Sequence, residues 1–214
     1  YKSFKAFDKI IRQVNSLNPD LVVITGDLID GSIAEDCRFC DILKTIKSRH
    51  GVIAITGNHE FYSGIDSFLK LAEKANIKVL RNEKTEIANT LQVVGIDDSA
   101  ARNFSLTGPD LDAALKDCDP DKPIILLSHR PDGFGRAEKK GVDFQISGHT
   151  HAGQIPPMDI IVYLAVKYPF GLYRKNDAHI YTSCGTGYWG PPMRFLSRAE
   201  IVQFSLVPLE KKAH

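Results

Sequence analysis

The sequence predicts an α/β protein built on a largely parallel β-sheet that is covered by helices on both faces. Two patterns support this prediction. Helix-like and strand-like segments alternate along most of the chain, and the strand-like segments are continuous runs of apolar residues. A continuous apolar run is typical of a strand that is buried on both faces, as strands are when helices pack on each side of a parallel sheet.

The predicted helices are identified by an apolar face and by the turn residues that end them. In the first helix, Phe4, Phe7 and Ile11 fall on one face, and the Asn-Pro-Asp segment at 18–20 ends it. The predicted helices cover residues 2–17, 34–48, 65–75, 110–117 and 134–140. The predicted strands cover residues 21–25, 52–56, 78–80, 86–88, 92–95, 124–128 and 144–147.

The last third of the chain has a different character. Proline, glycine and aromatic residues become frequent there, and two further strands are predicted near residues 179–183 and 200–207. This pattern predicts a second sheet packed against the first. At 214 residues, without an internal repeat or a low-complexity linker, the chain is expected to form a single domain over residues 1–214.

The composition excludes several classes of protein. The chain is 43% hydrophobic and 25% charged, which is ordinary for a soluble globular domain. Its formal net charge is +1, and basic residues form no dense block apart from Lys211-Lys212, so nucleic acid is not expected as a partner. The sequence contains neither a secretory signal nor a membrane-spanning run. It starts inside a predicted helix without a methionine, so we expect that upstream sequence has been removed.

The cysteines do not predict a disulfide framework. Cys37 and Cys40 form a C-x-x-C pair, but the pair lies inside the predicted helix 34–48 and has no second pair elsewhere. We therefore expect these cysteines to pack within the helix rather than to serve a redox or zinc site.

Side chains that bind metal ions follow four of the predicted strands. Because ligands gather beyond the carboxyl ends of the strands in an open α/β sheet, these positions are expected to converge. One carboxylate, one amide oxygen and three imidazoles suit a divalent transition metal. His149 and His151 point the same way in an extended segment, so both can belong to one cluster. The candidate ligands are Asp27, Asn58, His129, His149 and His151.

Each of these positions also has an ordinary structural explanation. Asp27 can cap a following helix, Asn58 can occupy a turn, and His129 can be a loop histidine. The metal-site interpretation depends on the occurrence of all four motifs in one chain, each at the end of a predicted strand.

The four motifs, in their order along the chain, resemble those of calcineurin-like metallophosphoesterases. They are Gly26-Asp27-Leu28-Ile29-Asp30, Gly57-Asn58-His59-Glu60, Ser128-His129 and Gly148-His149-Thr150-His151. The resemblance implies a four-layer α/β/β/α sandwich of two mixed sheets. It also implies hydrolysis of a phosphate ester or pyrophosphate by metal-bound hydroxide, with two divalent transition metal ions (Mn, Fe or Zn) as cofactors.

The resemblance implies a role for each matching ligand. Asp27 would bridge the two ions. Asn58, His129 and His149 would complete one metal site, and His151 would join the other.

Further residues are candidates for contact with the substrate. The resemblance implies that His59 is catalytic together with Asn58, and that it protonates the leaving group beside the scissile phosphate. Glu60 is expected to orient His59 or to cap a helix. Arg130 and Arg194 are candidates for phosphate binding, because a guanidinium matches a phosphate in a bidentate way, but either can equally form an ion pair. Asp97-Asp98 follows a predicted strand and is a further candidate without an assigned role.

One motif of the family is missing from this chain. An Asp-x-His at the end of the first strand, upstream of Gly26, supplies ligands to the metal site that His151 joins, and no such motif precedes Gly26 here. The chain therefore supplies only one site in full. Two explanations stay open: the first strand precedes Tyr1 in a longer protein, or the protein holds a single metal. An alternative function, a catalytically impaired interaction module, also stays open.

Later motifs resemble the bacterial YkuE-like branch of the family. The segments that carry this resemblance are 95–98, 148–156 and 185–187. Some relatives are UDP-2,3-diacylglucosamine pyrophosphatases, which implies a lipid-linked or nucleotide-sugar substrate. Members often carry membrane or export segments, so we expect a membrane-associated bacterial protein, with the cytoplasmic side favoured.

The segment 155–175 combines many apolar residues with Lys167, Arg174 and Lys175. Apolar side chains rimmed by cations suit a lipid substrate or a peripheral contact with a membrane. A buried helix or strand that packs the second sheet explains the same composition. Both interpretations stay open.

Overall fold

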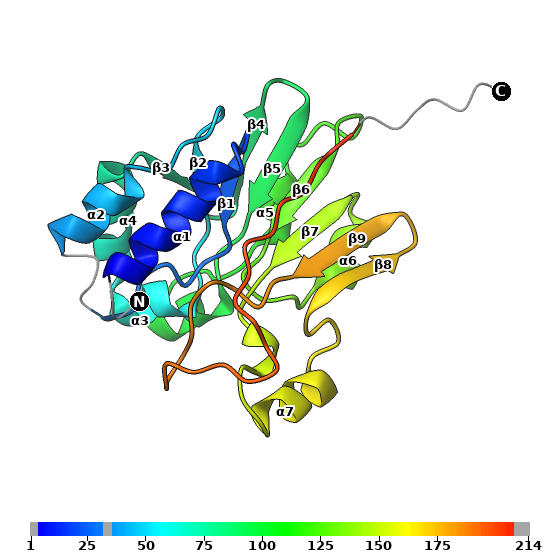
Figure 1. Cartoon of the computed structure of the whole chain (residues 1–214). Coiled ribbons are helices and arrows are strands. Elements are labelled where there is room, and N and C mark those ends of the chain that lie inside the picture. The colour runs from blue at the N-terminus through cyan, green and yellow to red at the C-terminus, as the bar shows by residue number, and fades with distance from the viewer. Residues whose placement is uncertain (1–3, 32–35, 208–214) are drawn as a thin grey trace.

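Two β-sheets lie face to face in the computed structural model, and helices cover the outer face of each sheet (Figure 1). The structure describes residues 4–31 and 36–207. This order of layers is the α/β/β/α sandwich that the family resemblance implies. The prediction of a sheet with helices on both faces is wrong, because one face of each sheet packs against the other sheet.

The smaller sheet has three parallel strands in the order β1-β2-β3. The strands are β1 (Val22–Ile24), β2 (Val52–Ala54) and β3 (Ile77–Val79). The helices that cover it are α1 (Phe4–Ser16), α2 (Cys37–Leu43) and α4 (Ile65–Lys74). Helix α2 is shorter than predicted, and its predicted start at residues 34–35 lies outside the described residues. Cys40 is buried in this helix layer, and all four cysteines are free.

The larger sheet has six strands in the order β4-β5-β6-β7-β9-β8. The strands are β4 (Glu83–Ile87), β5 (Leu91–Gly95), β6 (Ile124–Leu127), β7 (Phe144–Ser147), β8 (Gly171–Lys175) and β9 (Ala178–Thr182). The four central strands are parallel, and a hairpin makes each edge antiparallel. Helices α5 (Leu111–Leu115) and α6 (Phe134–Lys139) pack on its outer face.

Four short helical elements were not predicted. They are α3 (Asn58–Ser63), η2 (Ser99–Phe104), η3 (His151–Gly153) and α7 (Met158–Ala165). Helix α7, for example, is apolar almost all round, so its sequence shows no spaced apolar face by which a helix is identified.

The strands divide between the two sheets differently from the prediction. The sequence predicts strands 124–128 and 144–147 in the first sheet, whereas the structure places them in the larger sheet as β6 and β7. The cause is the β4-β5 hairpin. It leads the chain out of the smaller sheet, and β5 then pairs in parallel with β6.

The prediction of a strand at 200–207 is wrong for the described structure, which shows no strand there. Phe204 nevertheless lies between the two sheets, and its ring centroid is 5.0 Å from that of Phe144 and 5.3 Å from that of Tyr181. The apolar pattern correctly indicates burial. A strand also requires a neighbouring backbone to pair with, and none of the described strands pairs with this segment.

The segment 155–175 divides into an exposed helix and a sheet strand. Helix α7 has no buried residue, whereas β8 pairs with β9 at the edge of the larger sheet. Strand β8 therefore belongs to the larger sheet, but it is an edge strand without a buried residue, so the interpretation of a buried element is wrong for both parts of the segment. Among the described residues, no helix is long and apolar enough to cross a membrane.

Successive side chains face opposite sides of each sheet, and this alternation builds the apolar layers. On β2, Val52 and Ala54 face the helices, while Ile53 faces the other sheet. On β5, Val93 faces the smaller sheet, and Val94 faces α5 and α6. Strands buried on both faces explain why the sequence shows continuous apolar runs.

The tight packing between the sheets can be tested at Gly95. A Cβ atom at this residue would overlap the side chains of Leu80 and Ile55. We expect Gly95→Ala to lower the free energy of unfolding by about 1–3 kcal/mol, because overpacking forces the sheets apart. Urea unfolding measures the change. Gly135→Ala is the control, since its Cβ would meet only the flexible end of Lys175. Equal stability of the two variants would contradict this packing.

Candidate metal centre

Four candidate ligands lie beyond the carboxyl ends of strands from both sheets. Strands β1 and β2 lead into the loops that carry Asp27 and Asn58, and β6 and β7 lead into those that carry His129 and His149. These strand ends meet at one edge of the sandwich. Residues as far apart in sequence as Thr25 and His129 are therefore in contact there.

The imidazole of His129 is at the centre of this group. Its Nδ1 lies 2.7 Å from the carbonyl oxygen of Thr25, which can only accept a hydrogen bond, so Nδ1 carries a proton. Three atoms surround its Nε2: Asp27 Oδ2 at 3.1 Å, His149 Nδ1 at 3.1 Å and Asn58 Oδ1 at 3.3 Å.

The four converging atoms fit a divalent metal ion. Carboxylate, amide and imidazole groups together suit a borderline cation, provided that each imidazole offers an unprotonated ring nitrogen to it. The ligand atoms of Asp27, His129 and His149 all lie within 4.8 Å of one another. One ion can therefore contact all of them.

The ionisation of Asp27 favours a cation at this position, and a bound metal ion would take the place of the proton that Asp27 holds on His129 Nε2. Burial raises the pKa of Asp27, but the hydrogen bond and charge of His129 outweigh it and hold that pKa well below its usual value. Burial lowers the pKa of His129, but the hydrogen bond and charge of Asp27 outweigh it and raise that pKa. Asp27 is thus an anion at neutral pH that attracts positive charge to the centre of the site.

Two other histidines are held in the neutral form. Burial, together with the charges of His129 and Arg130, lowers the pKa of His149 to about 4. Burial, together with the charge of Arg194, lowers the pKa of His151 to about 4. Both imidazoles are therefore neutral at pH 7, which is the form that binds metals.

The buried carboxylate of Glu60 holds two ligand loops together. It accepts hydrogen bonds from Asp27, Leu28 and Ile29 N–H at 2.8, 2.7 and 3.1 Å, and from Gly57 N–H at 2.6 Å. Burial and the charge of Asp27 raise the pKa of Glu60, and these N–H groups oppose that shift. Glu60 therefore caps α3, as expected, and also fixes the loop after β1, which the sequence did not show.

The ligand loops require unusual backbone conformations. A Cβ at Gly57 would overlap Asp27 Oδ1, and a Cβ at Gly26 would lie 2.8 Å from His129 Nδ1. Asp27 and His149 adopt φ angles of 55° and 67°, in the left-handed region that costs a non-glycine residue about 1–3 kcal/mol. Such strain persists only where surrounding contacts impose it.

The sequence matches one protein family over most of its length. The family model described as calcineurin-like phosphoesterase matches residues 1–153. The chain belongs to the calcineurin-like phosphoesterase family. It is 41% identical over 203 residues to an uncharacterized metallophosphoesterase of Helicobacter pylori, a match that covers 94% of this chain and 55% of that protein.

Two other relatives of this phosphoesterase are informative. The match to a transmembrane protein with metallophosphoesterase domain from Bos taurus is 39% identical and covers 93% of this chain and 48% of that protein. The match to the uncharacterized metallophosphoesterase YkuE of Bacillus subtilis is 29% identical and covers 96% of this chain and 74% of that protein. The chain spans about half the length of several curated relatives that it matches.

Solved structures share the fold of the phosphoesterase. The NAD nucleotidase of Haemophilus influenzae aligns with a TM-score of 0.52 at 18% identity, over 84% of this chain and 43% of that one. A putative 5'-nucleotidase from Staphylococcus aureus aligns with a TM-score of 0.54 at 15% identity, over 86% of this chain and 44% of that one. At these identities the likeness concerns the fold alone.

In the phosphoesterase, His59 lies beside the ligand group and contacts a second carboxylate. Its backbone N–H donates to Asp27 Oδ1 at 2.9 Å, and its ring Nδ1 lies 3.0 Å from Asp30 Oδ1. The His59 side chain is 33% exposed, so a ligand can reach it. Asp30 was not predicted as a site residue. Its signal in the sequence is the second aspartate of the motif that starts at Gly26.

His151 lies outside the cluster that Asp27, His129 and His149 form. Its Nδ1 lies 3.2 Å from an Arg194 nitrogen, and the charge of Asp27 still acts on its pKa.

Arg194 also contacts the backbone of the loop at residues 184–187. Its guanidinium donates to the carbonyl oxygens of Cys184 and Gly187 and to the hydroxyl of Ser197. These contacts differ from the phosphate-binding role that the sequence suggests. They hold the 184–187 loop against His151.

Arg130 connects a buried carboxylate to one of the candidate ligands. Its Nε donates to Asp98 Oδ2 at 2.8 Å, and its NH1 lies 2.8 Å from His149 Nε2. Asp98 is 3% exposed, so it orients Arg130 from inside the protein. The sequence identified Asp98 as a candidate, but its partner could not be inferred from a position 32 residues away.

A network of hydrogen bonds holds Asp98 in position. Its backbone N–H donates to Thr56 Oγ1 at 3.0 Å, and that hydroxyl donates to Asp97 Oδ1 at 3.0 Å. Arg81 pairs with Asp97 at 2.8 Å. The ends of β2 and β5 are therefore joined through polar contacts beneath the ligand group.

The clamp formed by Glu60 can be tested with Glu60→Gln. The amide nitrogen of glutamine cannot accept the hydrogen bonds that one carboxylate oxygen accepts, so buried N–H groups lose their partner. We expect the free energy of unfolding to fall by about 2–4 kcal/mol, and metal affinity to fall with it. Urea unfolding and metal titration measure the two effects. The exposed Glu73→Gln on α4 is the control, and equal behaviour of the two variants would contradict the clamp.

The orienting role of Asp98 can be tested with Asp98→Asn. Loss of its charge weakens the contact to Arg130, which in turn leaves His149 less constrained. We expect metal affinity to fall by about 10- to 100-fold, as for other groups that orient metal ligands. Competition with a fluorescent chelator measures the affinity. Asp121→Asn, at an exposed position, serves as the control. An unchanged affinity in Asp98→Asn would show that His149 is oriented without it.

Proposed function

We propose that this phosphoesterase hydrolyses a phosphate ester or pyrophosphate in a metal-dependent reaction. The observation that supports it most is the convergence of Asp27, Asn58, His129 and His149 around one point. Membership of the calcineurin-like phosphoesterase family supports the same class of reaction.

We propose that these four residues hold one divalent ion and that Asp27 and His151 contribute to a second. The nitrogen and oxygen ligands favour manganese, iron or zinc. A bound divalent ion would supply positive charge that activates water and stabilises the charge on the phosphoryl oxygens. The position of His151, beside the cluster but outside it, supports its assignment to the second ion.

We propose that His59 is the general acid and delivers a proton from Nε2 to the leaving oxygen. Asp30 accepts a hydrogen bond from Nδ1, which orients the ring. The backbone contact to Asp27 ties His59 to the metal centre. Asn58 directly precedes His59 at the start of α3 and acts as a metal ligand.

Of the two candidate arginines, Arg130 is the one that we propose for contact with the substrate phosphate. Its side chain is 30% exposed and lies against the ligand His149. Arg194 instead donates to several backbone oxygens, so we propose that it positions His151.

The proposed substrate is a lipid-linked or nucleotide-sugar phosphoester. Exposed apolar side chains near the site, such as Leu164 and Leu196, support a lipid-linked substrate. Two proteins that share the fold are named as nucleotidases, which supports the nucleotide alternative. Hydrolysis assays with a phospholipid, a nucleotide sugar and a small diester distinguish these classes.

We also propose that the protein is membrane-associated and bacterial, with the site on the cytoplasmic side. Relatives from Helicobacter pylori and Bacillus subtilis support a bacterial source, and relatives from Bos taurus and Danio rerio are named as transmembrane proteins. Fractionation of cells that express the tagged protein, followed by protease protection, tests both the association and the side.

The alternative of a catalytically impaired interaction module is not supported. The relatives carry the name metallophosphoesterase, and the ligand group is assembled in the structure.

Metal content and hydrolysis of bis-p-nitrophenyl phosphate with added Mn²⁺ test the proposed function. We expect His59→Ala to lower kcat by about 10²- to 10⁴-fold while metal content is unchanged, because it removes a proton donor and not a ligand. His149→Ala should lose both metal and turnover. His50→Ala, outside the site, is the control and should retain both. Turnover in His149→Ala equal to that of the unaltered chain would falsify this assignment.

A further inference from the structure

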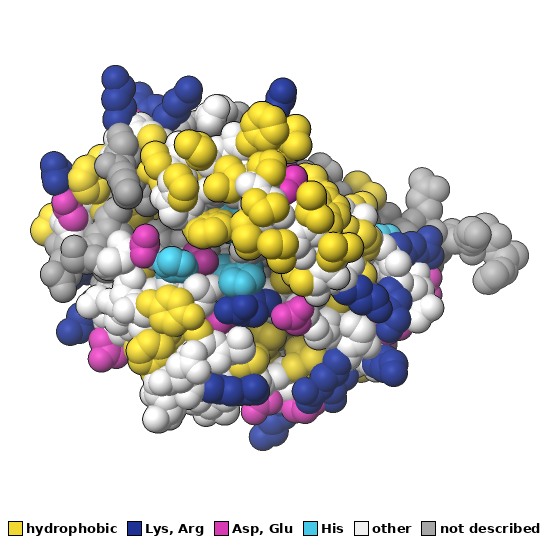
Figure 2. Space-filling model, turned by 90° about the horizontal axis from the view of Figure 1, so that it is seen from below, with side chains coloured by type: hydrophobic (Ala, Val, Ile, Leu, Met, Phe, Trp, Pro, Cys, Tyr) yellow, Lys and Arg dark blue, Asp and Glu magenta, His cyan; other side chains and the backbone are white. Residues whose placement is uncertain are grey.

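An exposed apolar surface borders the metal centre. It combines Ile160, Tyr163 and Leu164 of α7 with Trp189, Phe195 and Leu196 of a later loop, and we call these six residues the apolar rim. Leu164 is 84% exposed and Leu196 is 81% exposed. Figure 2 shows hydrophobic side chains gathered on this face of the molecule, next to histidine side chains. Side chains of this size are rarely left in water together unless they contact a partner.

The two parts of the apolar rim are joined to each other and to the site. Gln154 is fully buried, and its side chain bonds both the N–H and the carbonyl oxygen of Trp189, at 2.9 and 2.8 Å. Its own carbonyl oxygen accepts from Phe195 N–H at 2.8 Å. Ser197 donates to the carbonyl oxygen of His151 at 2.7 Å. The rim is therefore a fixed part of the surface beside this histidine.

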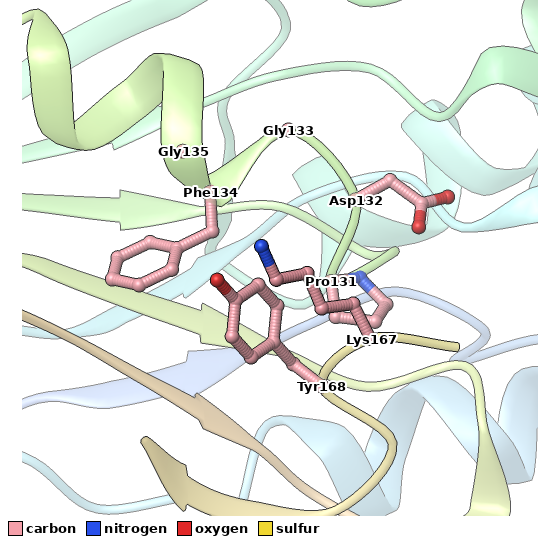
Figure 3. Close-up of a pocket in the computed structure, with 7 residues that line it drawn as sticks. All are labelled: Pro131, Asp132, Gly133, Phe134, Gly135, Lys167 and Tyr168. Atoms are coloured by element: carbon pink, nitrogen blue, oxygen red, sulfur yellow. The ribbon is translucent and has the colours of Figure 1, made fainter. Parts of the chain in front are cut away.

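The other end of the α7 segment is held against the loop after His129. Lys167 and Tyr168 line a pocket with Pro131 and Phe134, and Figure 3 shows these side chains next to one another. The ring centroids of Phe134 and Tyr168 are 5.3 Å apart. One end of α7 thus follows the loop that carries His151, and the segment after its other end lies against the loop after His129.

Two basic residues border the segments that carry the apolar rim. Lys167 follows α7 and Arg198 follows the later loop, and within the described part of the chain neither forms a salt bridge. The only acidic residue of α7 is Asp159 in its first turn, at the end nearest the site. Figure 2 also shows Lys and Arg side chains at the border of the hydrophobic region.

We propose that the apolar rim docks on an anionic lipid bilayer and places the metal centre at the level of the headgroups. Aliphatic side chains with tyrosine and tryptophan, bordered by unpaired cations, match the apolar interior, the interface and the anionic headgroups of such a membrane. Lys167 and Arg198 form no salt bridge in the described structure and complement anionic headgroups, so the charge pattern favours lipid.

Docking in this way also specifies the substrate class. The phosphate of an amphiphilic phosphoester would reach the metal centre while its acyl chains stay in the bilayer beside α7. The docking depends on the surface alone, whereas the amphiphilic substrate rests on the proposed function.

Sedimentation with vesicles tests the proposal. The unaltered chain should bind vesicles of equal parts phosphatidylcholine and phosphatidylglycerol more tightly than vesicles of phosphatidylcholine alone. Two double variants each remove apolar side chains from one part of the rim. Ile160→Gln with Leu164→Gln alters α7, and Phe195→Gln with Leu196→Gln alters the later loop. Each pair should lower the partition coefficient by about tenfold or more, because the apolar side chains no longer enter the bilayer.

Leu206→Gln is the matched control. Leu206 is 59% exposed, close to the 60% of Ile160, but it lies in the terminal segment, away from α7. The control should bind vesicles normally. Every variant should still hydrolyse the small substrate bis-p-nitrophenyl phosphate, because none of the altered residues is a candidate metal ligand or the proposed general acid.

Three outcomes would overturn the docking proposal. They are an active chain that binds no vesicles, vesicle binding that the rim variants retain, and a dimer in sedimentation velocity that the rim variants dissociate. Vesicle binding by a chain without any hydrolysis would instead contradict the proposed function and leave the docking supported.

Discussion

The carboxylate of Glu60 is the interaction on which the metal centre depends. It accepts hydrogen bonds from the loop after β1 and from the start of α3, and so fixes Asp27 and Asn58 relative to each other. Without this acceptor, several backbone N–H groups in the interior would lose their partner, which is costly. The left-handed conformation of Asp27 is strained by itself, and Glu60 is the group that compensates for it locally.

His129 and His149 follow strands of the larger sheet and are positioned by contacts with other loops. Thr25 fixes the ring of His129 through its carbonyl oxygen, and Asp98 fixes Arg130 against His149. The two halves of the site come from different sheets, so the apolar layer between the sheets sets their distance. Substitutions in that layer are therefore expected to alter the metal centre as well as stability.

The same chain segments build the site and the surface beside it. The loop that carries His151 continues into α7, and the loop that carries Arg194 also carries the exposed Phe195 and Leu196. Gln154 binds the two loops together. A ligand that contacts this surface therefore meets the site at a defined orientation, and this connects the shape of the protein to the class of substrate that we propose.

Local patterns in the sequence were sufficient to predict the α/β class, most helices and strands, and the gathering of Asp27, His129 and His149 at one place. Apolar periodicity and glycine-containing motifs are encoded in neighbouring residues, and each ligand sits directly after a strand. The division of strands between two sheets, the second role of Glu60, the partners of Asp98 and the exposure of α7 were decided only in the tertiary structure. Each depends on contacts between residues that are distant in the chain, such as the 104 positions between Thr25 and His129, and a pattern within one segment cannot contain them.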